Sequence, residues 1–183
     1  MTESEVLADA PTADYDGQPN GLSAETKILI AEVVLSASQA EYSAGLLLQT
    51  IHDLAGDKGT AKGWGLSGER LLELLKPHIP AELHRNYSGV LQFRNALIHG
   101  LVISGEAMKG KEGAGKFYVM KPDRKGVGIS GLDPFILNHS EMATIVKVFE
   151  YIDEELSRLD RELYDARSEL HPNPSGPSDR VSE

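Results

Sequence analysis

Residues 23–54 of this chain read SAETKILIAEVVLSASQAEYSAGLLLQTIHDL, and this stretch decides the class of fold. Ser23 is a favourable N-cap, and Glu25 places an acidic side chain in the first turn, where the helix dipole favours negative charge. Apolar side chains then recur at steps of three and four, at Ile30, Val33, Ala37, Ala40, Ala44, Leu47, Ile51 and Leu54. This period predicts a helix packed along its length, and its three alanines would let a neighbouring helix approach closely.

Three further helices are expected along the chain. A short one starts at its cap, Ser67, and runs to Pro77, and a third starts near Pro80 and ends near Gly105. The last begins at Asn138 or Ser140 and continues to Leu170, with apolar residues again at steps of three and four. Four helices of this kind predict an all-α fold, an up-down helical bundle.

Residues 106–136 do not follow the helical period. Lys116–Lys121 (KFYVMK) and Val127–Ser130 flank Pro122–Gly126, a stretch rich in turn-forming residues. This pattern predicts a β-hairpin inserted in the bundle at about residues 114–131.

The ends of the chain differ from its middle. Residues 1–21 are acidic and lack a hydrophobic period, and residues 171–183 are rich in Pro and Ser, so both are expected to be disordered. One folded domain is therefore expected at residues 22–170. The chain has no cysteine, which excludes disulfides and thiol catalysis. Its apolar runs are too short to span a bilayer and its N-terminus lacks a basic region, so a cytoplasmic location is expected.

The charge is unevenly distributed. The whole chain carries a net charge of −10, which argues against general affinity for nucleic acid. Residues 58–125, however, contain 12 Lys and Arg against 6 Asp and Glu, whereas residues 138–170 contain 4 against 9. The middle of the chain is therefore locally positive, which is compatible with contact to RNA.

The segment Gln92–Gly100 (QFRNALIHG) lies in this positive region and places polar side chains in an apolar helix. At about 100° per residue, Asn95 and His99 share one face, and the long Arg94 side chain can reach the same place. Gln92 falls close to His99 on the helical wheel. Unpaired polar groups are costly to bury, so this group is a candidate site. Histidine can exchange a proton near neutral pH, and a guanidinium can bind phosphate oxygens.

The Arg94–Asn95–x3–His99 spacing resembles the Arg-polar-x3-His motif of the HEPN superfamily (higher eukaryotes and prokaryotes nucleotide-binding). The resemblance implies a metal-independent endoribonuclease with catalytic residues Arg94, Asn95 and His99, leaving a 2′,3′-cyclic phosphate. It also implies a homodimer in which two motif helices face each other, no cofactor, and a role as a toxin or anti-phage defence effector with a possible protein antitoxin. One departure is Leu101, since a tyrosine that receives AMP groups often stands there in toxins paired with nucleotidyltransferases.

Basic side chains around the expected hairpin form a second candidate region, for binding RNA substrate: Lys116, Lys121, Arg124 and Lys125. In one interpretation they contact phosphates while Phe117 or Tyr118 stacks on a base. In the other they belong to a solvated loop, because lysines commonly protect exposed strand edges.

Plainer alternatives to a ribonuclease remain. Arg94 could pair with a carboxylate such as Glu32 or Glu150, with His99 satisfied in the core. The domain could also be a non-catalytic helical module that binds a protein partner or a nucleotide. Gly63–Gly68 matches Gly-x-Gly-x-x-Gly, but it follows a helix, so a flexible connector is expected there. The six histidines show no pair one helical turn apart, so no metal site is expected.

Overall fold

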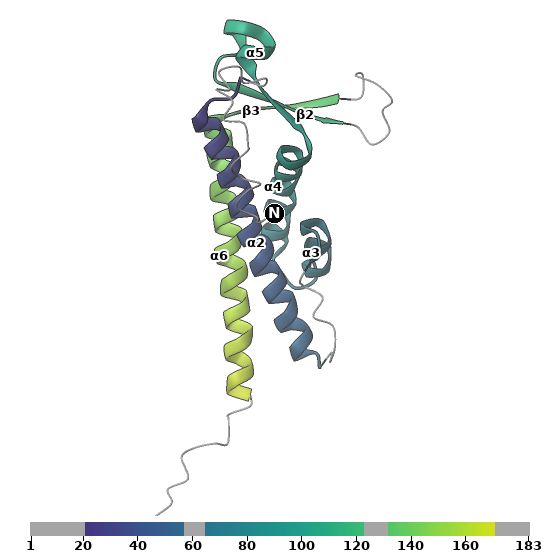
Figure 1. The fold of residues 1–183 in the computed structure, drawn as a ribbon. Coiled ribbons are helices and arrows are strands. Elements are labelled where there is room, and N and C mark those ends of the chain that lie inside the picture. The colour runs from purple at the N-terminus through teal and green to yellow at the C-terminus, as the bar shows by residue number, and fades with distance from the viewer. Residues whose placement is uncertain (1–20, 57–64, 123–131, 171–183) are drawn as a thin grey trace, which may run out of the picture.

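A computed structural model describes residues 21–56, 65–122 and 132–170. Figure 1 shows long helices topped by a small sheet. The helices are α2 (Ala24–Leu54), α3 (Gly68–Leu75), α4 (Ala81–His99), α5 (Gly105–Lys109) and α6 (His139–Leu170), with a 3-10 turn, η1 (Gly110–Gly113). The strands are β1 (Leu101–Ser104), β2 (Lys116–Pro122) and β3 (Leu132–Asn138). The predicted helical bundle with an inserted hairpin is confirmed.

The two longest helices, α2 and α6, lie side by side and run in the same direction (Figure 1). Three polar contacts follow their shared length: Thr26 with His139, Ser43 with Asp153, and Thr50 with Asp160. The predicted stripe of α2 is buried at its centre, where Val33 and three alanines have no exposed surface: Ala37, Ala40 and Ala44. These small side chains allow close helix packing, as the sequence indicated.

Helix α4 completes the core and runs opposite to α2, toward the sheet (Figure 1). Tyr87 on α4 and Phe149 on α6 are both fully buried, and their rings meet edge to face with centroids 6.5 Å apart. Such aromatic pairs favour this geometry. Leu47, Ile152 and Leu156 lie in the same core cluster.

The predicted caps are present. The side chains of Ser23 and Ser67 accept hydrogen bonds from backbone N–H groups in the first turns of α2 and α3. At α6, Asn138 and Glu141 exchange hydrogen bonds of 2.8 and 2.9 Å between side chain and backbone. This reciprocal pattern is a capping box, and it fixes where the last strand becomes the last helix.

Helix α4 ends at His99, so the expectation that this helix continues to about Gly105 was wrong. The N–H of Gly100 bonds to the carbonyl of Ala96 at 2.7 Å, and Gly100 itself is extended. Leu101–Ser104 then forms β1, which pairs with β2.

The predicted hairpin is part of a larger sheet. Strand β2 matches the predicted Lys116–Lys121, but it lies in the centre of a three-stranded antiparallel sheet, between β1 and β3. Leu101 pairs with Met120, and Lys116 pairs with Asn138. The expected second strand, Val127–Ser130, lies outside the described residues, as do the tail and all of the leader except Gly21. Across the described ranges, no helix has both the length and the apolar character needed to cross a membrane.

Candidate functional site

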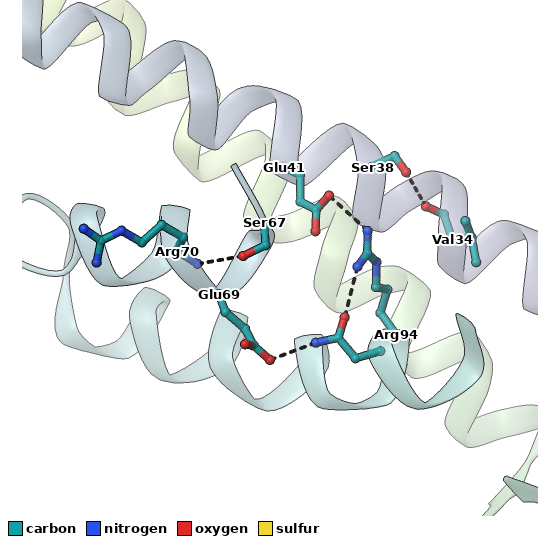
Figure 2. Close-up of polar contacts among 8 residues, drawn as sticks. Val34, Ser38, Glu41, Ser67, Glu69, Arg70 and Arg94 are labelled. Carbon is teal, nitrogen blue, oxygen red and sulfur yellow. Dashed lines mark hydrogen bonds and ion pairs between the residues drawn. The ribbon is translucent and has the colours of Figure 1, made fainter. Parts of the chain in front are cut away.

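Arg94 points from α4 toward α2. One of its guanidinium nitrogens, Nη2, lies 3.1 Å from Oε2 of Glu41 (Figure 2). The two side chains are 20% and 19% exposed, so the ion pair is mostly shielded from water. Burying either charge alone would be costly, and the pairing compensates for part of that cost. The alternative in which Arg94 pairs with a carboxylate is therefore right, although the partner is Glu41 and not Glu32 or Glu150.

Asn95 continues the same polar chain toward α3. Arg94 donates to the Asn95 side-chain oxygen at 3.0 Å, and the Asn95 amide donates to Glu69 at 3.0 Å (Figure 2). The resulting network, Glu41–Arg94–Asn95–Glu69, connects α2, α4 and α3. These bonds hold Arg94 and Asn95 in fixed positions next to each other.

The Glu41 carboxylate on α2 packs closely against Gly68, the first residue of α3. A Cβ added to Gly68 would lie 2.5 Å from Oε1 of Glu41 and 2.9 Å from Leu91, so only glycine leaves room for the carboxylate. Burial raises the pKa of the Glu41 carboxyl, whereas Arg94 and the Gly68 backbone N–H lower it. The pKa of Glu41 is raised overall because the loss of solvation is the largest effect.

Three polar atoms in this region are buried and have no hydrogen-bond partner among the described residues: Oε1 of Glu41, Nε of Arg94 and the Tyr87 hydroxyl. Burial raises the pKa of Tyr87 far above its ordinary range, and the nearby negative charge of Glu41 raises it further. The inner end of the Arg94 site therefore combines one ion pair with unsatisfied hydrogen-bonding capacity, an unusual and costly arrangement.

His99 lies differently. It is the last residue of α4 and is exposed. The alternative in which His99 is buried in the core with its hydrogen bonds satisfied was therefore wrong. Within the part of the chain that the structure describes, no hydrogen bond joins His99 to Arg94 or Asn95. One copy of the chain thus brings Arg94 and Asn95 into contact and places His99 one turn beyond them, facing solvent.

Gln92 lines a groove between α3 and α4. The groove has a volume of about 390 Å³. Its walls carry Glu69, Leu72, Glu73, Lys76, His84, Ser88 and Leu91. Gln92 and His99 are seven residues apart, about two turns, so both lie on the α4 face that carries this groove.

The basic residues predicted to bind RNA are spread apart. Lys116 is exposed, and it borders a separate hollow of about 190 Å³ that also contains His139 and Thr26. Lys121 lies at the other end of β2, next to the end of α4, because Met120 pairs with Leu101. Arg124 and Lys125 lie outside the described residues.

The interpretation in which Phe117 or Tyr118 stacks on an RNA base was wrong. Phe117 and Tyr118 are both buried, so neither ring is free to stack on a base. Instead, the Phe117 ring packs against His139, and the Lys109 amine lies 5.9 Å above the Tyr118 ring. These rings stabilise the sheet, since cations and aromatic edges are favourable neighbours of a ring.

The residues that surround Arg94 were not predicted from the sequence. Glu41 and Tyr87 lie on regular apolar helices, and Glu69 lies in the first turn of α3, where an acid is ordinary. Glu41 is 53 positions from Arg94, and no local pattern signals such a pairing. The one available signal was Glu41 itself, a charged residue that directly follows Ala40 of the apolar stripe of α2.

Comparisons of the chain with protein-family models, with curated proteins and with solved structures give no match. The HEPN resemblance therefore rests on the motif residues and on the helical fold. Among residues 21–56, 65–122 and 132–170, no three His, Asp or Glu side chains are grouped so that they could hold a metal ion.

Proposed function

We propose that this chain is a metal-independent endoribonuclease of the HEPN type, acting as a homodimer in the cytoplasm as a toxin or anti-phage defence effector. The observation that carries the proposal is the exposure of His99 one turn beyond the fixed pair of Arg94 and Asn95. A histidine at the end of a helix, open to solvent, can exchange protons with a substrate.

In the proposed reaction, His99 accepts the proton of a ribose 2′-hydroxyl, and the 2′-oxygen attacks the adjacent phosphorus. The bond to the 5′-oxygen breaks, and a proton returned to that oxygen completes its departure. The products are a 2′,3′-cyclic phosphate and a 5′-hydroxyl. Arg94 stabilises the charge on the phosphorane oxygens, because a guanidinium can donate two parallel hydrogen bonds to them. Asn95 positions Arg94 through the 3.0 Å hydrogen bond between them.

The second copy of the chain has a defined part in this scheme. In one copy His99 is exposed while Arg94 is turned toward Glu41, so a single chain presents an incomplete site. A homodimer would contribute a second His99 that can return the proton. In this proposal Lys121, whose backbone lies at the end of β2 nearest α4, contacts the RNA backbone. A protein antitoxin remains part of this proposal as a possible partner.

One observation favours a second candidate function. Arg94 already has the Glu41 carboxylate and the Asn95 amide oxygen as partners, so its charge is paired and one donor on each of its two terminal nitrogens is used. A non-catalytic module that uses the same helices to bind a protein partner or a nucleotide would show this arrangement. In that case Arg94 is structural and His99 is a surface residue.

Variants with matched controls distinguish the two functions. We would measure cleavage of single-stranded and structured RNA by wild type, His99→Ala and Arg94→Ala. The controls are His78→Ala and Arg85→Ala, which remove an exposed histidine and an exposed arginine away from the motif. The ribonuclease requires loss of activity in the first two variants only. A binding module requires no cleavage by any folded protein in the series.

A further inference from the structure

The groove between α3 and α4 has the size and the lining of a small-molecule site. Its volume is about 390 Å³. Ligand pockets in proteins occupy about 300–1,000 Å³. Two buried leucines, Leu72 and Leu91, lie among polar and charged side chains in its lining. An apolar floor with a few polar groups at its edges suits a flat molecule with polar edges, such as a nucleobase.

Helix α4 connects this groove to the motif through one polar face. At 100° per residue, five polar side chains of α4 fall within about 80° of one another. These residues are His84, Ser88, Gln92, Asn95 and His99. The first three line the groove. Gln92 is seven residues from His99, which is about 10.5 Å along the helix at 1.5 Å per residue. A single strand of RNA that lies along this face with a phosphate at His99 therefore has a nearby base beside the groove.

Glu69 connects the groove to the motif a second time. Its carboxylate lines the groove and accepts a hydrogen bond of 3.0 Å from the Asn95 amide. The Asn95 oxygen in turn accepts a hydrogen bond from Arg94. The wall of the groove is thus fixed relative to the proposed phosphate-binding residue, so a ligand in the groove has a defined position relative to the motif.

The charges of the lining decide which part of an RNA strand fits there. Helix α3 contributes two carboxylates, Glu69 and Glu73, whereas Lys76 and His84 lie at the end where α3 connects to α4. Carboxylates repel a phosphate, but they accept hydrogen bonds from N–H groups. The stretch of the groove beside the two carboxylates therefore suits a neutral base with N–H donors, and the backbone lies outside it.

Guanine matches this stretch best among the four bases. Its Watson–Crick edge presents two adjacent donors, N1–H and N2–H, beside the O6 acceptor, and one carboxylate can accept from both donors. Glu73 is the available carboxylate, because its ion pair with Arg70 is 67% exposed on the Glu73 side and such pairs exchange readily. Glu69 already accepts from Asn95. The exposed Gln92 amide, on the α4 side of the groove, can donate to O6.

We propose that the α3–α4 groove binds a guanine base of single-stranded RNA. Glu73 accepts from N1–H and N2–H, and Gln92 donates to O6. This binding site rests on the proposed ribonuclease function and narrows its substrate to RNA with unpaired guanines. Because the groove and His99 belong to one face of α4, cuts should fall at a fixed number of nucleotides from a guanine.

Binding is tested apart from cleavage with 2′-O-methyl oligonucleotides, which lack the attacking 2′-hydroxyl. Fluorescence anisotropy would compare UUGUU, UUAUU, UUCUU and UUUUU. Wild type is expected to bind UUGUU about tenfold more tightly than UUUUU, since bidentate contacts discriminate between bases to this degree. Glu73→Gln and Gln92→Ala should each reduce this preference to about twofold or less. The controls are Glu82→Gln, on α4 about 160° from His84, and Gln39→Ala on α2, and both should keep it.

Each contrary result has a definite meaning. Failure of wild type to bind any of these oligonucleotides, equal binding of all of them, or an unchanged preference in both Glu73→Gln and Gln92→Ala would overturn the guanine site. Cleavage of ordinary RNA at positions unrelated to guanine, and unchanged in Glu73→Gln, would reject the site and leave the ribonuclease. Guanine-dependent binding without any cleavage would reject the ribonuclease and leave the site.

Discussion

Arg94 on α4 and Glu41 on α2 form an ion pair of 3.1 Å, and this contact joins two helices whose paired residues are 53 positions apart. The pair holds the motif arginine against the bundle, so a phosphate that binds Arg94 has to compete with Glu41. Arg94 thus has a structural partner within the fold and a proposed role in binding substrate.

Separating these two roles requires measuring the coupling between the residues. Glu41→Gln and Arg94→Gln should each lower the free energy of unfolding by about 1–3 kcal/mol, because each leaves one charge shielded from water without its partner. The double variant should lose less than the sum of the two, with a coupling of about 1 kcal/mol or more. Chemical denaturation of all four proteins gives the cycle. Additive losses would mean that the pair contributes nothing to stability.

The raised pKa of Glu41 gives a dependence on pH with a definite sign. Its native pKa lies above the ordinary 4.5, so the native state binds this proton more tightly than the unfolded chain does. The contribution of Glu41 to stability therefore falls as pH rises from about 4.5 through the native pKa, and is constant above it.

Urea denaturation of wild type and Glu41→Gln between pH 4.5 and pH 7 measures this directly. The unfolding free energy of wild type minus that of Glu41→Gln should decrease toward neutral pH. A difference that increases with pH would show instead that Arg94 lowers the native pKa below 4.5.

The buried Tyr87 hydroxyl has no hydrogen-bond partner among the described residues. Removing it should cost nothing, so Tyr87→Phe is expected to be neutral or more stable by up to about 1 kcal/mol. Tyr87→Ala, which also removes the ring packed on Phe149, should lose about 3–5 kcal/mol. Thermal and urea denaturation would compare them. A clear loss of stability in Tyr87→Phe would show that the hydroxyl is bonded in solution.

Two glycines of α4 and its end should respond oppositely to alanine. At Gly100 a Cβ would lie 2.4 Å from the Ala96 carbonyl oxygen and 3.0 Å from that of Met120, so Gly100→Ala should destabilise by about 1–3 kcal/mol. At Gly89, inside the helix, a Cβ meets nothing within 4 Å, and Gly89→Ala should stabilise by about 0.5–1 kcal/mol. Similar effects at both positions would contradict the sharp transition from α4 to β1.

The helices were predictable from the sequence because their signals are local. Ser23 and Ser67 cap α2 and α3, and the three- and four-residue spacing of α2 matches its buried side. The transition at Gly100 was not predictable, because Leu101 and Val102 continue the helical period by chance. They form a strand only because β2, some 16 residues later, pairs with them. Tertiary pairing here prevails over the local pattern.

The candidate site, like the fold, was predictable from the sequence only where its signals are local. The sequence identified Arg94, Asn95 and His99 by their spacing within one helix. Glu41 could not be found, because its contact with Arg94 depends on how α2 and α4 pack. The sequence also suggested exposed aromatics at Phe117 and Tyr118, but burial depends on the whole sheet, and both rings are covered.

The ribonuclease proposal is tested most directly by the chemistry of the RNA ends produced in excess EDTA. Purified wild type should cleave RNA to 2′,3′-cyclic phosphate and 5′-hydroxyl ends, and His99→Ala, folded and in the same oligomeric state, should lose at least about a hundredfold in rate. Cleavage by wild type and His99→Ala at equal rates, or no cleavage by a folded dimeric wild type, would contradict the account.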